Sequence, residues 1–158
     1  KYRGAYGITP NIKELSDVAG FVINNNDSDI ERIGRKVRET FQIENIFVTR
    51  SEKGITCINK NGSAHCVSVA QDVFDVSGAG DTVMAVLAAA AAVNLDMMTT
   101  LELANTAAGI AVSRVGTYPV GHTEMINAWC GSAMMRTAYI PISCEEAKNK
   151  VNTCKSQG

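Results

Sequence analysis

Residues 74–82, with the sequence Phe-Asp-Val-Ser-Gly-Ala-Gly-Asp-Thr, constrain the fold of this chain more than any other segment. They connect a short apolar stretch to a long alanine-rich segment, which predicts a helix from Asp81 to about Val93. Two glycines at the junction allow the backbone to turn sharply. The surface of the helix is almost uniformly small and apolar, which predicts that the helix is buried between other elements.

The same turn is a candidate anion site. The backbone N–H groups of Gly78, Ala79 and Gly80 can face outward at the positively polarised start of the helix, where they suit a phosphate. The carboxylate of Asp81 would repel a phosphate, but it can contact a neutral hydroxyl that attacks the phosphate. We therefore interpret Asp81 as a catalytic residue in phosphoryl transfer. The alternative is structural, because Gly-x-Gly is often only a tight turn and Asp at a helix start is often only an N-cap.

Short apolar runs alternate with helix-compatible segments along the chain. Strands are predicted at residues 5–9, 21–23 and 45–49, and two further runs flank Asn61-Gly62, a strong hairpin signal. Helices are predicted at residues 11–18, 29–41, 81–93 and 99–114. This alternation predicts an α/β fold with a mainly parallel sheet flanked by helices and one β-hairpin. Ligands of such sheets bind at the carboxyl ends of the strands, where Thr9, Thr49 and Asp75 are expected.

Composition excludes several classes of function. The chain has 158 residues, 20% of them charged, and a formal net charge of −1, so it lacks the basic surplus that nucleic-acid binding requires. Its longest apolar run is too short and too weakly hydrophobic for membrane insertion. Its five cysteines lack metal-binding spacing and are typical of free thiols in a reducing compartment, which predicts a cytoplasmic protein.

Residues 75–82 resemble the second signature of the ribokinase-like (PfkB) carbohydrate and nucleoside kinases, with every position filled. The resemblance extends over about residues 9–120. It implies a ribokinase-like fold, of which this chain would supply the C-terminal, nucleotide-binding part. It also implies ATP and Mg²⁺ as cofactors, Asp81 as general base, and an anion hole formed by residues 78–80. No Gly-Lys-Ser/Thr follows the glycines, so the segment is not a P-loop.

Asn11 and Glu14 lie three residues apart at a predicted strand-to-helix junction and share one face of the first helical turn. Oxygen ligands of this kind suit Mg²⁺ that is bound through water. The structural alternative is that Asn11 caps the helix and Glu14 supports the cap. The kinase family carries an Asn-x-x-Glu motif at this place. The resemblance therefore favours a functional role and assigns Asn11, Ile12, Lys13 and Glu14 to the ATP site.

The segment from Thr49 to Gly54 joins a predicted strand to the hairpin. The family usually has a Thr-x-Gly-x-x-Gly turn here, which lines the nucleotide phosphates. The resemblance therefore assigns Thr49, Arg50, Ser51 and Gly54 to ATP binding. This chain departs from the pattern, because Ser51 replaces the first glycine. Arg50 either pairs with a phosphate or is a solvated turn residue, and the sequence leaves both possibilities open.

Small residues follow Asn105 on the next predicted helix. They leave room for a flat ring, and the side chain of Asn105 can both donate and accept hydrogen bonds. The family builds its adenine pocket in this region, so the resemblance assigns Asn105, Ala108 and Gly109 to ATP binding. The alternative is close helix packing, which small residues also allow. Asp75 and Gly116 match positions that hold a monovalent cation, such as K⁺, in some relatives.

A narrower resemblance covers nearly the whole chain, which is similar to the branch of the family that phosphorylates heptose 7-phosphate. The segments that carry it are Tyr2-Arg3-Gly4-Ala5, Ile8-Thr9-Pro10-Asn11, Val48-Thr49-Arg50-Ser51-Glu52, residues 75–82, residues 104–109 and Val115-Gly116-Thr117. That kinase usually forms the N-terminal half of a bifunctional enzyme. The resemblance implies transfer of the γ-phosphate of ATP to the anomeric hydroxyl of D-glycero-β-D-manno-heptose 7-phosphate, for ADP-heptose and lipopolysaccharide core synthesis. Residues 1–142 would then belong to the kinase domain. Residues 143–158 would form a polar helix and a linker toward a missing nucleotidyltransferase domain.

Other interpretations of the chain stay open at this point. One is another sugar or nucleoside kinase of the same family, and another is a non-catalytic nucleotide-binding module. The intact Asp81 argues against the second, because a carboxylate beside a phosphate contributes nothing to simple binding. The parent protein could be a homo-oligomer, a state that the sequence does not determine. The exact sugar also stays open, because most sugar contacts in the family come from sequence that precedes this part of the domain.

Overall fold

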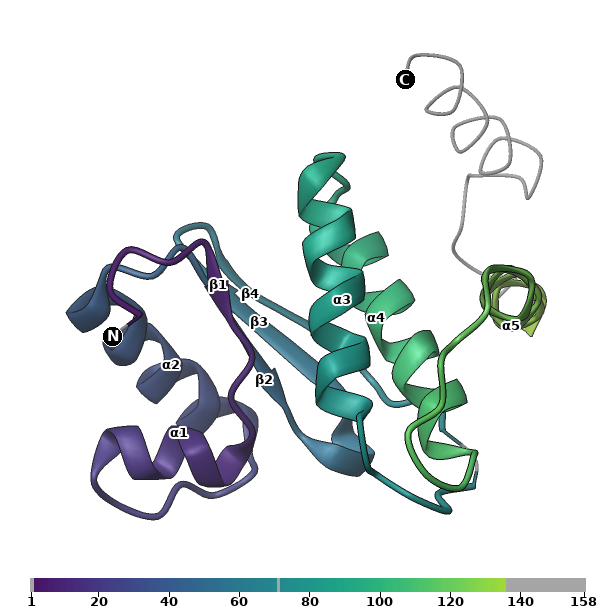
Figure 1. The fold of residues 1–158 in the computed structure, drawn as a ribbon. Helices are drawn as coiled ribbons and strands as arrows, with labels where there is room; N and C mark the ends of the chain where they lie inside the picture. Colours follow the sequence, from purple (N-terminus) through teal and green to yellow (C-terminus); the bar gives the residue numbers. More distant parts are fainter. Residues whose placement is uncertain (1, 71, 136–158) are drawn as a thin grey trace. The chain divides into compact units, whose positions relative to one another are not determined.

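The computed structural model describes residues 2–70 and 72–135. These residues divide between two compact units, with the division after Val120. The first unit contains, in chain order, β1 (Gly7–Ile8), α1 (Ile12–Ala19), α2 (Asp27–Phe41), β2 (Asn45–Thr49), the 3₁₀-helix η1 (Ser51–Lys53), β3 (Ile55–Asn59), β4 (Gly62–Cys66), α3 (Ala79–Ala92) and α4 (Met97–Val112) (Figure 1). The second unit contains α5 (His122–Met135). The predicted boundary between residues 142 and 143 lies outside the described residues. None of the described helices is long and apolar enough to cross a membrane.

The first unit is built on a four-stranded sheet in the order β1-β2-β3-β4. β1 pairs with β2 in parallel, whereas the β2–β3 and β3–β4 pairs are antiparallel. β1, β2 and β4 therefore run in the same direction, and β3 runs against them. The α/β class and the hairpin are confirmed. The sheet of the described residues is mixed, because the hairpin contributes both antiparallel pairs.

The hairpin turn lies one residue earlier than the sequence signal indicates. Asn59 pairs with Gly62, so the two loop residues are Lys60 and Asn61. Gly62 is instead the first residue of β4, where it has a φ of 135°. Gly62 therefore belongs to β4 and not to the turn. The Asn61-Gly62 pair correctly predicts a hairpin, but it does not predict which residues form the turn.

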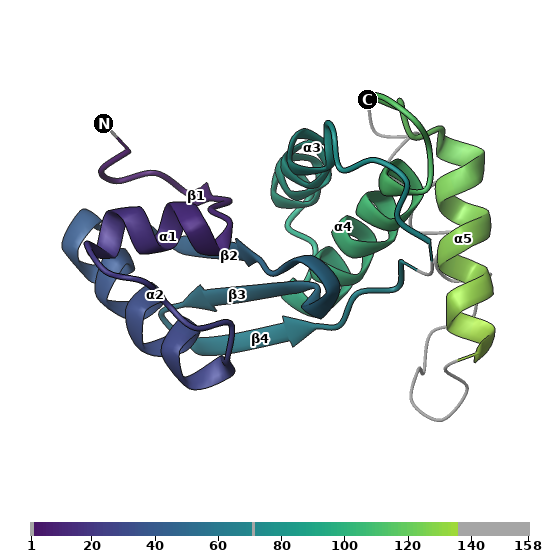
Figure 2. The same cartoon turned by 90° about the horizontal axis from the view of Figure 1, so that it is seen from below.

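Alternation along β2 creates two cores, one on each face of the sheet. Ile46 and Val48 point into a core with α1 and α2, whereas Phe47 between them points into a core with α3 and α4. Figure 2 shows the sheet between these two helix pairs. The first core consists of Leu15, Ile23, Ile30, Ile33, Val37, Ile43, Ile46, Val48 and Ile58. The second consists of Phe47, Ile55, Cys57, Cys66, Val83, Leu87, Leu101 and Ala104.

α3 begins at Ala79, two residues before the predicted start, and its surroundings differ from the prediction. Val83, Leu87 and Ala90 are buried, but the opposite side of the helix is exposed, including 43% of Met84. The prediction that this helix is buried on all sides is wrong for the described residues. Apolar side chains cover both of its faces, but only one face has a partner in the first unit.

Residues 21–23 form a loop, so the strand predicted there is absent. Gly20 ends α1 in the left-handed conformation, with a φ of 80°. Of the three apolar residues that follow, only Ile23 is buried, and its N–H donates to Oγ of Ser16 at 3.0 Å. Val22 is 86% exposed. A three-residue apolar run is too short to distinguish a strand from a loop that buries one side chain.

Candidate functional site

The candidate residues gather at one edge of the sheet. Because β1, β2 and β4 run in the same direction, the segments that follow Ile8, Thr49 and Cys66 leave the sheet at one shared carboxyl edge. α1 and α3 both begin at this end of the unit (Figure 1). A parallel bridge between Asn11 and Thr49 joins two of the candidate segments directly. Ligands of α/β sheets bind at such carboxyl edges, which makes this edge the candidate site.

Asn11 and Glu14 form a capping box at the start of α1. Oδ1 of Asn11 accepts from the N–H of Glu14 at 2.8 Å, and Oε2 of Glu14 accepts from the N–H of Asn11 at 2.9 Å. The capping alternative is therefore present in the structure. Both side chains remain exposed, and Oε1 of Glu14 makes no hydrogen bond with the residues that the structure describes. Between them, Ile12 packs against the first core, and Lys13 pairs with Asp17 at 3.1 Å.

Arg50 is almost completely buried, with 1% of its surface exposed. Its Nε donates to Oδ1 of Asn25 at 2.8 Å, and its Nη1 donates to Oδ1 of Asp27 at 2.7 Å and to Oγ1 of Thr56 at 3.0 Å. The hydrogen bond from Arg50 and its charge hold the pKa of Asp27 below the ordinary value. Arg50 is thus neither a solvated turn residue nor a side chain free to meet a phosphate. It ties the loop before α2 to the turn between β2 and β3.

The turn after Arg50 is the 3₁₀-helix η1, which ends at Gly54. Ser51 has a φ of 54°, in the left-handed region, at the position where the resembling family has glycine. Gly54 has a φ of 85°, and a Cβ atom added to it would lie 2.1 Å from the carbonyl oxygen of Cys66. The backbone of the turn therefore lies in close contact with the backbone at the end of β4. Thr49 enters it with its N–H bonded to the carbonyl of Pro10 at 3.0 Å.

Asp75 does not follow a strand, because residues 67–70 and 72–75 form none. Instead, the N–H groups of Phe74 and Asp75 both donate to the carbonyl of Val112, at 2.8 and 3.2 Å. Oδ1 of Asp75 accepts from the N–H of Ser77, and Oδ2 accepts from the N–H of Gly116, both at 2.9 Å. These hydrogen bonds, those from Ser77 first, lower the pKa of Asp75. The two residues assigned to a monovalent cation thus meet through a hydrogen bond.

Gly78 is the N-cap of α3 and has a φ of 77°. A Cβ atom there would lie 3.0 Å from Cγ2 of Thr117, so the turn needs glycine for both conformation and space. Of the three amides assigned to the anion hole, that of Ala79 donates to the carbonyl of Val76 at 3.2 Å. The amides of Gly78 and Gly80 have no acceptor among the described residues. The start of α3 therefore presents unpaired donors, as an anion site requires.

Asp81 lies in the first turn of α3 and is exposed. The N-cap position belongs to Gly78, so Asp81 does not serve as the cap. Within residues 2–70 and 72–135, its carboxylate has no hydrogen-bond or ion-pair partner. An exposed carboxylate beside unpaired amides is free to accept a hydrogen bond from the hydroxyl of a ligand.

Asn105, Ala108 and Gly109 lie on α4 and pack against neighbouring segments. Asn105 is 4% exposed, and its Nδ2 donates to the carbonyl of Val67. Ala108 is partly buried against the second core. A Cβ atom on Gly109 would lie 3.5 Å from Cγ2 of Val69. The small residues therefore allow α4 to lie close to the segment that follows β4. The close helix packing considered as the alternative is present in the structure.

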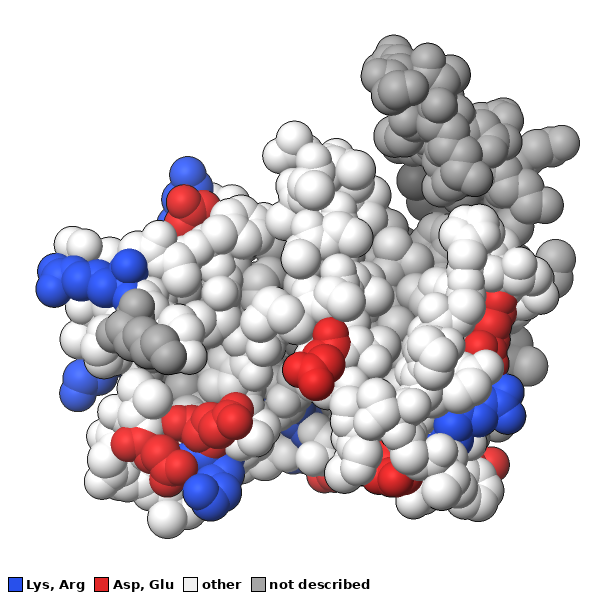
Figure 3. All heavy atoms as spheres, in the orientation of Figure 1, with Lys and Arg blue, Asp and Glu red and all other residues white. Residues whose placement is uncertain are grey.

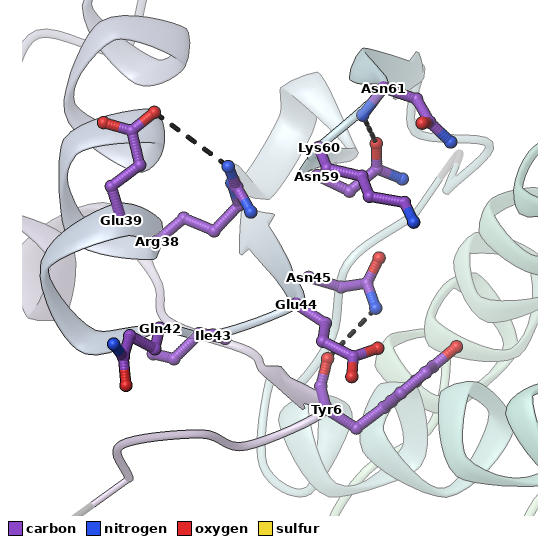
Figure 4. Close-up of a pocket in the computed structure, with 10 residues that line it drawn as sticks. All are labelled: Tyr6, Arg38, Glu39, Gln42, Ile43, Glu44, Asn45, Asn59, Lys60 and Asn61. Atoms are coloured by element: carbon purple, nitrogen blue, oxygen red, sulfur yellow. Dashed lines mark hydrogen bonds and ion pairs between the residues drawn. The ribbon is translucent and has the colours of Figure 1, made fainter.

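A surface pocket lies at the opposite end of β2. Figure 4 shows its lining side chains, which come from the residue before β1, from the end of α2 through the start of β2, and from the end of β3 and the β3–β4 loop. They are Tyr6, Arg38, Glu39, Gln42, Ile43, Glu44, Asn45, Asn59, Lys60 and Asn61. None of them belongs to the predicted site. The pocket adjoins the amino end of β2, so it lies away from the edge where nucleotide ligands are expected.

The sequence did not reveal the contacts that Asn25, Asp27 and Thr56 make with Arg50. Asn25 and Asp27 belong to a polar run before a helix, a pattern that indicates capping. Their partner lies more than twenty residues further along the chain. The sequence feature that could have indicated these contacts is Arg50 itself. It directly follows an apolar strand, and a guanidinium group that is buried there needs hydrogen-bond acceptors from other segments.

Comparison with known proteins shows the family of this chain. A profile described as pfkB family carbohydrate kinase matches residues 2–123. The chain belongs to this family. The bifunctional protein HldE of Methylobacillus flagellatus is 44% identical over 125 residues, which are 79% of this chain and 25% of that protein. HldE of Photobacterium profundum is 38% identical over 159 residues, covering 100% of this chain and 33% of the relative.

Solved structures confirm the ribokinase-like fold of this pfkB family member. Phosphofructokinase-2 from Escherichia coli matches 82% of the chain with a TM-score of 0.74 and 17% identity. Ribokinase from Thermotoga maritima matches 80% with a TM-score of 0.68 and 25% identity. The chain covers 42% of each of these proteins. It therefore holds part of the kinase fold and spans about a quarter to a third of the two HldE relatives.

Proposed function

We propose that this chain is the nucleotide-binding part of an ATP-dependent kinase. In this proposal the kinase phosphorylates the anomeric hydroxyl of D-glycero-β-D-manno-heptose 7-phosphate in the bacterial cytoplasm. Membership of the pfkB family and the identity with HldE proteins support a sugar kinase. The observation that carries the proposal is the start of α3, where the exposed Asp81 stands beside the unpaired amide of Gly80. The activity belongs to a polypeptide that also contains the rest of the domain.

In the proposed reaction, Asp81 accepts the proton of the sugar hydroxyl as the oxygen attacks the γ-phosphorus of ATP. The bond from that phosphorus to the β,γ-bridging oxygen breaks, and ADP leaves. The N–H groups of Gly78 and Gly80 stabilise the charge on the transferring phosphoryl group, and that of Ala79 joins them if it releases the carbonyl of Val76. General-base catalysis of this kind contributes about 10²–10⁴-fold to the rate.

Mg²⁺ would neutralise the charge of the phosphates and orient them for transfer. Asn11 and Glu14 fit a site that binds Mg²⁺ through water, because both are exposed and Glu14 keeps one carboxylate oxygen free of its cap contact. Ile12 and Lys13 would lie beside this site. Within the described residues, no group of three or more His, Cys, Asp or Glu side chains is arranged to hold a metal ion.

The turn from Thr49 to Gly54 would contact the nucleotide phosphates through its backbone, because the Arg50 guanidinium is committed elsewhere. Asn105, Ala108 and Gly109 would back the adenine ring. A monovalent cation such as K⁺ at the loop that contains Asp75 and Gly116 is part of the same proposal. One solved neighbour, Escherichia coli phosphofructokinase-2, was determined in complex with potassium.

The test is a kinase assay on a complete domain. A chimera in which this chain replaces the 125 matched residues of the Methylobacillus flagellatus protein provides one. We expect it to transfer phosphate from ATP to the heptose 7-phosphate, because this chain then supplies the nucleotide-binding part and the Methylobacillus flagellatus protein supplies the rest of the domain. In Asp81→Asn we expect turnover to fall by about 10²–10⁴-fold with little change in the KM for ATP. Unchanged turnover in Asp81→Asn would remove Asp81 from the mechanism, and a folded chimera that transfers no phosphate would contradict the kinase proposal.

A further inference from the structure

The turn from Arg50 to Gly54 has an unusual backbone conformation. Arg50 has a φ of −121° and a ψ of 25°, and Ser51 and Gly54 have φ values of 54° and 85°. A left-handed φ is unfavourable for a residue that carries a Cβ atom, so Ser51 is strained and Gly54 is not. Strained conformations persist only where the surrounding structure holds them. The conformation of Ser51 therefore depends on contacts that fix the turn.

Asn25, in the loop before α2, contacts both ends of the turn. Its Oδ1 accepts from Nε of Arg50 at 2.8 Å, and its Nδ2 donates to the carbonyl oxygen of Arg50 at 3.3 Å. One side-chain amide thus fixes both the side chain and the main chain of the residue immediately before Ser51. The backbone carbonyl of Asn25 also accepts from Nζ of Lys53, at the other end of η1. The strained residue therefore lies between two residues that Asn25 holds.

The Arg50 side chain is itself fixed at its far end. Its Nη1 donates to Oδ1 of Asp27 at 2.7 Å and to Oγ1 of Thr56 at 3.0 Å. Cationic side chains usually lie at the surface, where Figure 3 shows many Lys and Arg atoms, but Arg50 is 1% exposed. A buried guanidinium group cannot move without losing these hydrogen bonds. We call Arg50 and its three partners, Asn25, Asp27 and Thr56, the Arg50 clamp.

We propose that the Arg50 clamp compensates for the strain at Ser51 and holds the turn in the conformation that receives a nucleotide. Asn25, Asp27 and Thr56 are then positioning residues for ATP, which act through the turn. The proposal rests on the proposed function, in which the backbone of this turn contacts the nucleotide phosphates. Catalysis of phosphoryl transfer consists mostly of positioning and electrostatic stabilisation, so displacement of the turn weakens its contribution.

A clamp that only stabilises the fold has different consequences. Loss of a purely structural contact lowers the Tm, but the molecules that stay folded bind ATP as before. Under the proposal, ATP affinity falls even well below the Tm, because Ser51 leaves the left-handed conformation. Ser51→Gly then restores the affinity, because glycine adopts this conformation without the strain. A structural contact elsewhere in the fold gives no such rescue.

The test is calorimetric titration of this chain with ATP and Mg²⁺ at a temperature well below the Tm, with circular dichroism to confirm that each variant is folded. In Asn25→Ala we expect the dissociation constant for ATP to rise about fivefold. When Asn25→Ala is combined with Ser51→Gly, we expect a value within about twofold of the wild type. Asn24→Ala, at an exposed position of the same loop, is the matched control and leaves the affinity unchanged.

Thr56→Val gives a second comparison if Asn25→Ala does not fold. It removes one acceptor of Arg50 and leaves the contacts of Asn25 in place. We therefore expect a smaller loss of ATP affinity, of about twofold to threefold, which Ser51→Gly again recovers. Equal ATP affinities in the wild type and in the folded clamp variants would overturn the proposal. A loss of affinity that Ser51→Gly does not recover would also overturn it.

Hydrogen exchange observes the turn without ATP. The amides of Lys53 and Gly54 donate to the carbonyls of Arg50 and Ser51, so their exchange rates report whether the turn is held. We expect faster exchange in Asn25→Ala than in the wild type and in Asn24→Ala, and equal rates would overturn the proposal. Absence of ATP binding by the folded wild-type chain would contradict the proposed function, and the exchange rates would still decide whether the Arg50 clamp holds the turn.

Discussion

Gly54 is the residue at which the candidate site is least tolerant of change. It combines a φ of 85° with backbone atoms of Cys66 and Ser68 at 2.1 and 2.6 Å from the place of a Cβ. Gly54→Ala must therefore displace the end of β4, and we expect it to lower the free energy of unfolding by about 2–4 kcal/mol. Urea denaturation measures this loss.

Gly20→Ala is the matched control for that change. Gly20 has a φ of 80°, and no atom lies within 4 Å of its added Cβ. This variant carries only the backbone strain, of about 1 kcal/mol. Equal losses in the two variants would show that the contact between the turn and β4 does not constrain position 54.

Asp75 makes the stability of its loop depend on pH. Hydrogen bonds from Ser77 and Gly116 lower its pKa in the folded chain below the ordinary value of 3.8. A lowered folded pKa means that the carboxylate contributes stability above pH 3.8, and that this contribution is lost as the pH falls through the folded pKa. We expect Asp75→Asn to be less stable than the wild type at pH 7.

Thermal unfolding of both proteins between pH 7 and pH 3 tests this expectation. The difference in Tm should shrink at the acid end of the series as the wild-type carboxylate becomes protonated. Asp72→Asn, in the same exposed loop, is the control and should track the wild type throughout. A constant difference for Asp75→Asn down to pH 3 would contradict the role given to these hydrogen bonds.

Single residues could be predicted from sequence where the chemistry is local. The capping pair of Asn11 and Glu14 needed only their spacing, and its geometry is present in the structure. Ser51 shows the limit, because nothing in the sequence indicates that a serine holds a left-handed φ of 54°. The position of the Arg50 side chain depends on acceptors from the loop before α2. Neither alternative drawn from the sequence, a phosphate contact or a solvated turn residue, describes this position.

At the scale of elements, Arg50 joins the start of α2 to the turn between β2 and β3. We expect Arg50→Ala to lower the free energy of unfolding by about 2–4 kcal/mol, because it removes buried charge-assisted hydrogen bonds and leaves Asn25 and Thr56 without their donor. Chemical denaturation measures the loss. Arg50→Lys should recover only part of it, because an ammonium group cannot reproduce the fork of donors.

Arg32→Ala is the control for the Arg50 variants. Arg32 pairs with Asp29 at 3.0 Å near the same helix start, but its side chain is 62% exposed. An exposed pair of this kind contributes about 0–1 kcal/mol. If Arg50→Ala cost no more than Arg32→Ala, the buried guanidinium would not be what holds these elements together.

The boundaries of the four helices predicted in the first unit were correct to within two residues, and the caps explain the errors at two of their starts. α2 and α4 begin at Asp27 and Met97, each two residues before the predicted start. Their N-caps are Asn26 and Asp96, whose side chains accept from the backbone N–H three residues later. Before α2, all residues from 24 to 29 are polar, and before α4 both Asp96 and Thr99 can cap a helix, so sequence alone could not select the residue that caps.

For the whole molecule, alternation along the chain was sufficient for the α/β class but not for the environment of α3. An alanine-rich helix is compatible with burial on both sides, and the sequence does not show which partners this chain provides. Likewise, the pairing of β1 beside β2, and the open edge it leaves, depends on contacts between segments more than thirty residues apart. Contacts between distant segments therefore decide which faces of β1 and α3 have partners among the described residues.

We infer that the first unit binds the nucleotide of a kinase and that Asp81 acts on the hydroxyl of the acceptor and not on ATP. Calorimetric titration with ATP and Mg²⁺ of the wild-type chain and of Asp81→Asn tests it most directly, with circular dichroism to confirm that both are folded. We expect both proteins to bind ATP with dissociation constants that agree within about threefold, a free-energy difference of about 0.6 kcal/mol. Absence of binding in two folded proteins, or loss of binding in Asp81→Asn alone, would contradict it.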